Sequence, residues 1–346
     1  MNTIVTQIRD EKNITKEQLQ LLLETKDEAL VETLRREARE VADCIYGKRI
    51  FIRGLIEFTN YCKNDCYYCG IRRGNREAER YRLEKEQILD CCKTGYELGF
   101  RTFVLQGGED VFFTDERICD IVKDIKDRYP DCAVTLSIGE KSKESYEKYF
   151  EAGADRFLLR HETADAKHYG LLHPKEQTLE NRMRCLWDLK EIGYQTGCGF
   201  MVGSPNQSLD TLYQDLQFIR EFEPQMVGIG PFIPQHATPF ANEKPGTMEA
   251  TLRLLSIIRL LHPRVLLPST TALGTIHQFG REKGILAGAN VVMPNLSPKD
   301  FREKYQLYDN KICTKEEAAE GLTELKKRMN RIGYEVVVDR GDYQEM

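Results

Sequence analysis

After residue 48 the chain repeats one pattern, in which a short apolar run precedes a longer amphipathic stretch. Apolar runs of this length are typical of buried strands, and apolar residues spaced three or four apart are typical of helices. Eight candidate strands follow one another: 50–59, 102–106, 133–138, 156–160, 196–202, 226–229, 265–270 and 290–293. Eight such repeats over about 240 residues predict an α/β fold, the complete (βα)8 barrel of the TIM type.

The segments outside this pattern predict a helical extension at each end. Residues 1–48 are highly charged and carry leucines at helical spacing, and a helix near 315–331 precedes a short strand at 334–338. Between the strands, helices are expected at 85–98, 115–128, 178–192, 209–221 and 247–261. We therefore predict an N-terminal extension of 1–48, a barrel of 49–313, and a C-terminal extension of 314–346 packed on the barrel.

Composition excludes several classes of protein. A formal net charge of −5 argues against general binding of nucleic acid. No apolar run reaches the roughly 18 residues that suggest a membrane span, and the charged N-terminus lacks the apolar core of a signal peptide. The chain has 11 cysteines, scattered unlike a secreted disulfide framework. These features predict a soluble cytoplasmic protein.

Three of the cysteines, Cys62, Cys66 and Cys69, stand close together in a segment with no fourth cysteine and no histidine. A structural zinc site takes four protein ligands, and a [4Fe–4S] cluster held by protein alone takes four thiolates. Three thiolates leave one iron open to another ligand. The spacing, with Tyr68 before the last cysteine, resembles the signature of radical S-adenosylmethionine (SAM) enzymes, which cleave SAM reductively to a 5′-deoxyadenosyl radical.

Polar residues end most of the predicted strands, and in a barrel these ends meet at the face where active sites form. Bound SAM needs oxygen acceptors for its ammonium. The run Gln106, Gly107, Gly108 and Glu109 ends the second candidate strand and resembles the Gly-Gly-Glu motif of the superfamily. We predict that it binds the ammonium.

The carboxylate, ribose and adenine of SAM need further groups. A guanidinium suits a carboxylate because its planar fork binds two oxygens. Arg160, beside Glu162, and Arg182 are the candidates, and a structural Arg–Glu pair at the rim is the alternative. Glu140 resembles the acid that binds the ribose, while Tyr68 and Ile229 resemble groups near the adenine.

A narrower resemblance covers about residues 50 to 313. It is carried by these segments: IRGLIEFTNYCKNDCYYCG (52–70), QGGED (106–110), RHETAD (160–165), MVGIGPFIPQHATPFANE (226–243), PSTTALGT (268–275) and GANVVMPN (288–295). Together they resemble the HydE family of radical SAM maturases of [FeFe]-hydrogenase. Biotin synthase and methylornithine synthase share the barrel and the cysteine loop but fit the later segments less well.

The resemblance implies a substrate and partners. The substrate would be a cysteine-bound iron carbonyl cyanide unit from a HydG-type maturase, the product would be completed on a HydF-type scaffold, and an electron donor would reduce the cluster. Residues that resemble the lining of the substrate cavity are Arg53, Thr270, Thr271, Met293 and Tyr305. Among these, Arg53 is the sharpest prediction, because a cation facing a barrel interior needs an anion to offset its desolvation.

Some HydE proteins carry a second, [2Fe–2S] cluster on C-terminal cysteines. Here Cys313 stands alone in the sequence, with no further cysteine up to Met346. We predict no second cluster, which also argues against sulfur insertion of the biotin synthase type.

Three alternatives to a maturase stay open at this point. An amino-acid rearrangement of the methylornithine synthase type would use the same SAM apparatus with another pocket. A redox-sensing or electron-carrying iron–sulfur protein would not cleave SAM, and a zinc-binding scaffold would hold no iron.

Overall fold

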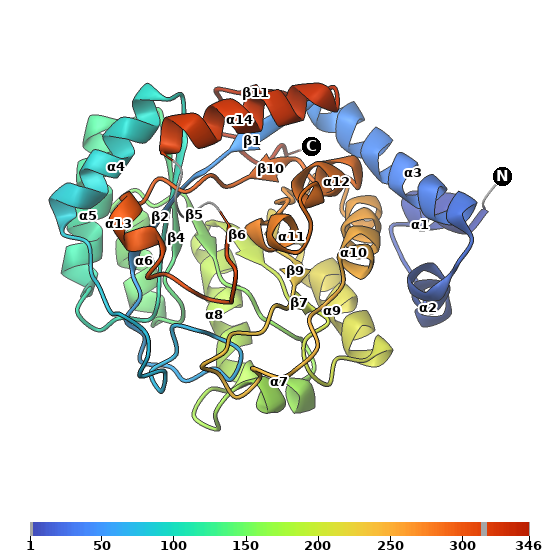
Figure 1. The fold of residues 1–346 in the computed structure, drawn as a ribbon, viewed down its shortest axis with the longest axis horizontal. Coiled ribbons are helices and arrows are strands. Elements are labelled where there is room, and N and C mark those ends of the chain that lie inside the picture. Colours follow the sequence, from blue (N-terminus) through green and yellow to red (C-terminus); the bar gives the residue numbers. More distant parts are fainter. Residues whose placement is uncertain (1–2, 313–316, 346) are drawn as a thin grey trace.

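The computed structural model describes residues 3–312 and 317–345, and its centre is a ring of parallel strands surrounded by helices (Figure 1). The strands have these bounds: β1 (Arg49–Ile52), β2 (Gly54–Thr59), β3 (Thr102–Gly107), β4 (Ala133–Ser137), β5 (Arg156–Leu158), β6 (Gln195–Cys198), β7 (Met201–Val202), β8 (Met226–Val227), β9 (Gly230–Pro231), β10 (Val291–Val292) and β11 (Glu335–Val337). One parallel sheet joins β2, β3, β4, β5, β6 and β8 in that order, and β7 pairs with β9.

The ring closes through the segments that follow β8. Leu266 bridges to Met226 of β8, and Pro268 bridges to Val291 of β10. Strand β10 pairs in parallel with β1. Because β1 continues through Arg53 into β2, the sheet returns to its start. The (βα)8 barrel that the sequence predicts is therefore confirmed.

Helices cover the outside of the ring. Their bounds are α1 (Thr3–Glu11), α2 (Lys16–Glu24), α3 (Glu28–Tyr46), α4 (Lys85–Glu97), α5 (Asp115–Arg128), α6 (Lys143–Glu151), α7 (Ala166–Leu172), α8 (Leu179–Ile192), α9 (Leu209–Phe222), α10 (Met248–Leu261), α11 (Thr271–Ile276), α12 (Gly280–Leu286), α13 (Lys299–Arg302) and α14 (Ala318–Arg331). Local sequence explains their starts. Asp27 accepts hydrogen bonds from the first amides of α3, and Ser208 and Thr211 form a capping box at α9.

The helices before the barrel pack on its outer layer. Helix α3 lies along α10, and α2 lies against α9, at the right of Figure 1. Arg35 of α3 pairs with Glu249 at 2.6 Å, and Arg253 of α10 donates to the carbonyls that end α2. The helices fit the predicted N-terminal extension, whereas the division into three domains stays a prediction.

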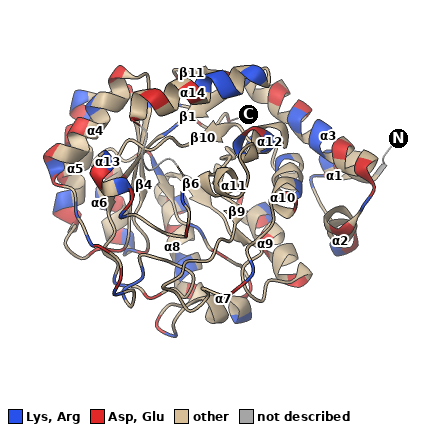
Figure 2. Cartoon of the chain, in the orientation of Figure 1, with Lys and Arg blue, Asp and Glu red and all other residues tan. Residues whose placement is uncertain are grey.

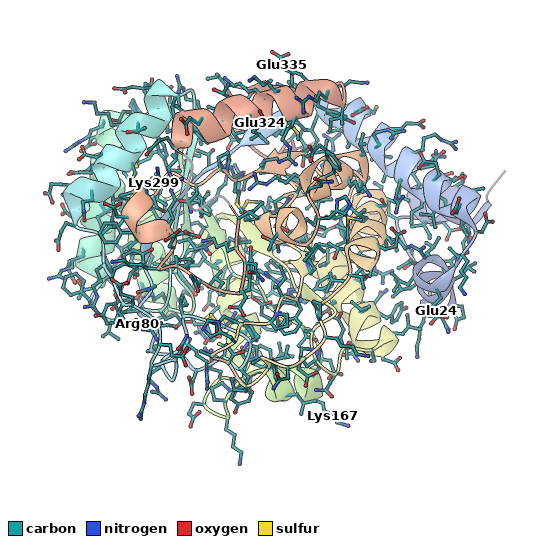
Figure 3. All side chains as sticks on the ribbon, in the orientation of Figure 1. Glu24, Arg80, Lys167, Lys299, Glu324 and Glu335 are labelled. Carbon is teal, nitrogen blue, oxygen red and sulfur yellow. The ribbon has the colours of Figure 1, made fainter. Side chains whose placement is uncertain are left out.

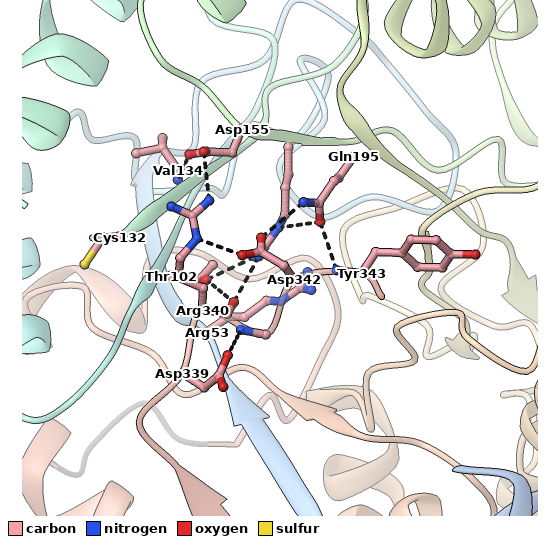
Figure 4. Close-up of polar contacts among 12 residues, drawn as sticks. Arg53, Thr102, Cys132, Val134, Asp155, Gln195, Asp339, Arg340, Asp342 and Tyr343 are labelled. Atoms are coloured by element: carbon pink, nitrogen blue, oxygen red, sulfur yellow. Dashed lines mark hydrogen bonds and ion pairs between the residues drawn. The ribbon is translucent and has the colours of Figure 1, made fainter. Parts of the chain in front are cut away.

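The C-terminal extension closes the end of the barrel at which the strands begin (Figure 4). Strand β11 pairs in parallel with β1. The guanidinium of Arg156, at the start of β5, is fully buried and donates to Asp342 at 2.6 Å and to the carbonyl of Arg340 at 3.0 Å. Thr102 donates to that same carbonyl, and Gln195 donates to Asp342. This end of the barrel is held by the chain's own charges.

Two predicted strands differ from the structure. The strand predicted at 50–59 bends at Arg53, because β2 pairs with β3 while the residues before it lie beside β11. The strand predicted at 265–270 has only isolated bridges at Leu266 and Pro268, and Thr270 accepts a hydrogen bond as the N-cap of α11. Because strand pairing ends at Pro268, Thr270 can serve as the first residue of the turn into α11.

Charge and burial follow the layers of the barrel. Charged residues colour the outer helices in Figure 2, whereas most of the strands are tan. Side chains fill the interior in Figure 3, and the labelled Glu24 and Lys167 lie at the outer edge. Within the described ranges, no helix is long and apolar enough to cross a membrane.

Candidate functional site

A cavity of about 340 Å³ lies inside the barrel and opens where the strands end. Its rim carries Cys62, Cys66 and Cys69, which follow β2. Its interior is lined by residues of the strands themselves, such as Glu57 of β2. The cysteine loop and the polar ends of the strands thus share one space, as the sequence predicts for a barrel.

Arg80, labelled in Figure 3, fixes the shape of the cysteine loop. Its guanidinium donates hydrogen bonds to four main-chain carbonyls of this segment: Asn60 at 2.5 Å, Ile71 at 2.8 Å, Arg72 at 2.6 Å and Asn75 at 3.1 Å. A loop without regular structure would otherwise leave these carbonyls to water. One side chain therefore supports the main chain on both sides of the cysteines.

The three thiols are set up for a metal cluster rather than for free thiolate chemistry. Burial raises the pKa of Cys66 to about 12, and it also raises those of Cys62 and Cys69. The negative charge of the neighbouring cysteines raises the pKa of Cys66 and that of Cys69 further. Thiolates here need a positive partner, which bound iron would provide. In the described part of the chain, no three His, Cys, Asp or Glu side chains are gathered around a single metal-ion position.

The Gly-Gly-Glu run lies directly against the cysteine loop. A Cβ at Gly108 would sit 2.2 Å from the Tyr61 carbonyl oxygen, so only glycine allows this approach. The amide of Glu109 donates to Cys62 Sγ at 3.4 Å. Its carboxylate packs over Gly139, accepts from the amide of Glu140, and lies 3.2 Å from Lys63 Nζ. The strand end and the cluster loop therefore form one unit.

Arg160 and Glu162 face the cavity with unused hydrogen-bonding atoms. Arg160 Nη2 lies 2.9 Å from Glu162 Oε2. Neither these two atoms nor Glu109 Oε2 has a hydrogen-bond partner within the described ranges, although all are buried. Each of these atoms lies beside an opposite charge, but buried charged groups usually also form hydrogen bonds, so these atoms are available to a ligand.

Glu140 and Arg182 form the structural pair that the sequence left as an alternative. Arg182 Nε donates to Glu140 Oε1 at 2.6 Å, while Asn181 donates to the other carboxylate oxygen. Arg182 Nη1 donates to the carbonyl of Arg160 at 2.6 Å. Arg182 lines the cavity, whereas Glu140 is not among the lining residues. Glu140 therefore supports Arg182 in this structure, and its contact with a ribose stays a prediction.

Tyr68 lines the cavity and is held by a histidine that sequence reasoning missed. Its hydroxyl lies 3.1 Å from His173 Nε2, and His173 Nδ1 lies 3.0 Å from the carbonyl of Tyr169. Burial, and then the charge of Arg182, lowers the pKa of His173 to about 3. A neutral His173 that donates to the carbonyl must accept from Tyr68, which fixes the tyrosine ring at the cavity wall.

The predicted substrate residues divide into two groups. Thr270, Thr271, Met293 and Tyr305 line the same cavity as the cysteines. Gln106 Nε2 donates to the Tyr305 hydroxyl at 3.4 Å, which links the end of β3 to this part of the wall. Their contact with a substrate stays a prediction.

Arg53 and Ile229 are not among the cavity-lining residues, and their predicted contacts with the substrate and with the adenine stay predictions. Arg53 is buried near the strand starts, with Nη1 2.6 Å from Met226 Sδ, and is not among the cavity-lining residues. Burial, and then the charge of Arg156, lowers its pKa, which the carboxylate of Asp342 opposes. Asp342 thus offsets part of the cost of burying this charge, while Arg53 Nε and Nη2 have no hydrogen-bond partner within the described residues. Ile229 is wholly in the core, and the neighbouring β9 lines the cavity instead.

Two further cavity residues were missed, Glu57 and Lys311. Their side chains form an ion pair in which Lys311 Nζ lies 2.5 Å from Glu57 Oε1. The signal for Glu57 was present, because it is an acid within the otherwise apolar end of a strand. Cys313, on which the prediction about a second cluster rests, lies outside the described residues.

The donor set fits a [4Fe–4S] cluster with bound SAM. Three thiols stand beside two carboxylates and a guanidinium that keep unused buried atoms. The methionine end of SAM carries an ammonium and a carboxylate, which these groups complement in charge. The unused atoms are therefore explained by the ligand that the sequence signature implies.

Comparisons with known proteins agree with this geometry. Residues 56–219 match the Radical SAM superfamily. The chain is 44% identical over 324 residues to the [FeFe] hydrogenase maturase subunit HydE of Thermotoga maritima, which covers 94% of this chain and 92% of that protein. It is 30% identical to 3-methylornithine synthase of Methanosarcina acetivorans, over 93% of this chain and 90% of that protein.

Solved structures show the same barrel. Methylornithine synthase (PylB) superposes with a TM-score of 0.86 at 27% identity, over 96% of this chain and 97% of that chain. The maturase HydG superposes with a TM-score of 0.78 at 22% identity, over 96% of this chain and 74% of that chain, and it supports the fold alone.

Proposed function

The chain belongs to the HydE family of radical SAM enzymes, and on this premise we propose that it cleaves SAM reductively in the maturation of [FeFe]-hydrogenase. The observation that carries the proposal is one cavity that joins three thiols to buried charged atoms, which lie in ion pairs but have no hydrogen-bond partner in the described part of the chain. Family membership also makes the chain an enzyme, so a redox sensor and a zinc scaffold drop out as alternatives.

The residues of this chain divide the work of binding. Cys62, Cys66 and Cys69 would hold a [4Fe–4S] cluster and leave one iron for SAM. When bound, the cluster and SAM supply an electron and a 5′-deoxyadenosyl radical. The main chain of Gly107 and Gly108, with Glu109, would accept hydrogen bonds from the SAM ammonium.

Arg160 would bind the SAM carboxylate, supported by Glu162 and Arg182. Arg182 holds the main chain of Arg160 by donating to its carbonyl. Tyr68 would pack against the adenine, with its orientation set by His173. Apart from His173, these residues line the cavity, and the charges of the arginines and carboxylates complement those of SAM.

The substrate we propose is a cysteine-bound iron carbonyl cyanide precursor, delivered by a HydG-type maturase and passed on towards a HydF-type scaffold. Thr270, Thr271, Met293 and Tyr305 would line its pocket. An external electron donor would reduce the cluster. The similarity to HydE over nearly the whole of both chains supports this choice.

A second candidate is an amino-acid rearrangement of the methylornithine synthase type. It is favoured by the 30% identity to that enzyme and by the close superposition of its structure. It would use the same SAM apparatus, with an amino acid in the cavity in place of the iron complex.

The experiment that separates the two is anaerobic reconstitution with SAM and a reductant, followed by addition of either the HydG-derived iron complex or candidate amino acids. We expect deoxyadenosine or adenosyl transfer to depend on the iron complex. Turnover with an amino acid alone would support the second candidate and contradict the first.

A further inference from the structure

A buried ion pair in the cavity has no part in the SAM site described above. Glu57 projects from β2 into the cavity and is only 1% exposed. Its carboxylate accepts from Lys311 Nζ at 2.5 Å and from Asn295 Nδ2 at 2.8 Å. Its main-chain carbonyl accepts from the hydroxyl of Tyr81 at 2.7 Å. Glu57 is therefore held in one position from both ends.

Lys311 reaches Glu57 from a segment that crosses the mouth of the barrel. This strap, residues 303–312, follows α13 and runs across the middle of Figure 1. Its main chain is tied to the cysteine loop by the hydrogen bond from the Gly70 amide to the Leu307 carbonyl, at 2.9 Å. It is tied to the loop after β9 by the bond from the Asp309 amide to the Pro234 carbonyl, at 3.1 Å. The strap thus places the ammonium group of Lys311 at the wall of the cavity.

The ammonium of Lys311 keeps a donor for a ligand. An ammonium has three N–H groups. Within the described residues two acceptors are within hydrogen-bond distance of Nζ, namely Glu57 Oε1 at 2.5 Å and the carbonyl of Tyr305 at 3.0 Å. Because Lys311 also lines the cavity, its third N–H can serve a molecule bound there.

A purely structural role explains this pair poorly. Removing two charges from water costs free energy that their attraction often does not repay, and apolar replacements of such pairs are frequently as stable. The pair also stands in the wall beside Tyr305, where the proposed substrate would lie. A site with one fixed carboxylate and one fixed ammonium is complementary in charge to an α-amino acid, because each group can pair with the oppositely charged group of the ligand.

We propose that Glu57 and Lys311 together recognise the zwitterionic end of the substrate: Lys311 binds an α-carboxylate and Glu57 binds an α-ammonium. This inference rests on the proposed function, because it specifies which part of an amino-acid-bearing substrate the cavity reads. Glu57, which now accepts from Lys311, would also accept from the ammonium of the substrate. Both residues then determine specificity for substrates that carry both charges.

The test measures binding of three probes to the reconstituted, SAM-saturated enzyme by anaerobic calorimetry. S-methyl-L-cysteine carries both charges and no free thiol that could bind iron. 2-(Methylthio)ethylamine lacks the carboxylate, and 3-(methylthio)propionate lacks the ammonium. We expect wild-type protein to bind S-methyl-L-cysteine about ten- to a hundredfold more tightly than either analogue, the range for hydrogen bonds between charged groups.

Two variants assign the two charges. Lys311→Met should abolish the preference over 2-(methylthio)ethylamine, and Glu57→Gln should abolish the preference over 3-(methylthio)propionate. Lys326→Met removes an exposed lysine of α14 and should keep the wild-type ranking. If a variant does not fold, the relative affinities of the three probes for wild-type protein decide whether the inference stands.

Equal binding of the three probes to wild-type protein, or no binding of S-methyl-L-cysteine, would overturn the inference. So would retention of both preferences in the two variants. SAM cleavage with the iron complex is measured separately. If the complex is turned over but the three probes bind equally, this inference is rejected and the proposed function stands. If S-methyl-L-cysteine binds most tightly but the complex is not turned over, the proposed function is rejected and the recognition of both charges stands.

Discussion

The two ends of the barrel differ in how their charges are satisfied. Where the strands begin, Arg156, Asp342, Arg340 and Asp155 form a continuous set of ion pairs within the chain. Where the strands end, Arg160, Glu162 and Glu109 keep buried atoms without hydrogen-bond partners in the described residues. Arg53, near the strand starts, also keeps two buried nitrogens without hydrogen-bond partners in the described residues, so an unused atom marks a ligand position only where it also lines the cavity beside the thiols.

The largest expected effect is at the thiols. Replacing Cys69 with alanine removes one of three cluster ligands, and two thiolates cannot hold a [4Fe–4S] cluster at this site. We expect iron content and deoxyadenosine formation to fall to background. Cys44→Ala, at an exposed position of α3, is the matched control and should keep both. Undiminished SAM cleavage by the Cys69 variant would show that the open end of the barrel is not the reaction site.

The next effect separates a ligand-binding charge from a structural one. Arg160→Met should weaken SAM binding about ten- to a hundredfold, because it removes a charge-assisted pair with the SAM carboxylate. Equilibrium binding of labelled SAM to the reconstituted protein measures this. Arg184→Met removes an exposed arginine that pairs with Asp188, and its SAM affinity should match wild type. If the SAM affinity of Arg160→Met is also that of wild type, Arg160 has a structural role and does not bind the SAM carboxylate.

A smaller effect is expected at the support of the cysteine loop. Arg80→Met leaves four main-chain carbonyls without their donor. We expect iron content after reconstitution to fall by roughly half or more, since each lost hydrogen bond to a charged group costs about 1.5–3 kcal/mol. Arg76→Met, at an exposed position of the same loop, should load normally. Full loading of the Arg80 variant would mean that the loop keeps its shape without this side chain.

The smallest effect concerns the opposite end. Burial acts against the charge of Asp342, but the Arg156 guanidinium outweighs it and lowers the pKa of Asp342 to about 2. A lowered pKa gives stability that is present above about pH 4 and is lost as the pH falls towards 2. Asp342→Asn should cost about 1–2 kcal/mol at neutral pH, a figure reduced for the partial exposure of Asp342.

Urea denaturation from pH 7 down to pH 2 measures this effect. The difference between wild type and the Asp342 variant should shrink as the pH falls, while SAM affinity stays as in wild type. Asp127→Asn, at an exposed position of α5, is the control. A difference that stays constant from pH 7 to pH 2 would contradict the assigned ion pair.

Periodicity is enough to predict the barrel and its main helices, whereas the cluster site at the three cysteines stays a prediction. The helix expected at 115–128 has the same bounds in the structure, because its apolar spacing and end charges are local features. The position of Arg53 depends on a non-local feature. Asp342, whose charge opposes the lowering of the Arg53 pKa, lies almost 300 residues later in the sequence, so its influence cannot be read from the local pattern.

The contacts of Glu140 and Lys311 are also made by segments that lie far apart in the sequence, so the local pattern does not predict them. Glu140 ends a strand, as a ribose-binding acid would, but a helix that begins some 40 residues later places Arg182 and Asn181 on both of its oxygens. Lys311 lies in a segment without periodicity, and its approach to Glu57 depends on the path of the strap. Local chemistry predicts which strand ends are polar, whereas pairing between distant segments decides which of them stay available to a ligand.

The most direct test of the central claim is the EPR spectrum of the reduced, reconstituted enzyme recorded with and without SAM. The account predicts a [4Fe–4S] signal that changes when SAM is added, because SAM binds the iron that no thiolate occupies. The Arg160→Met variant should need more SAM for the same change. A spectrum that is identical with and without saturating SAM would contradict the account.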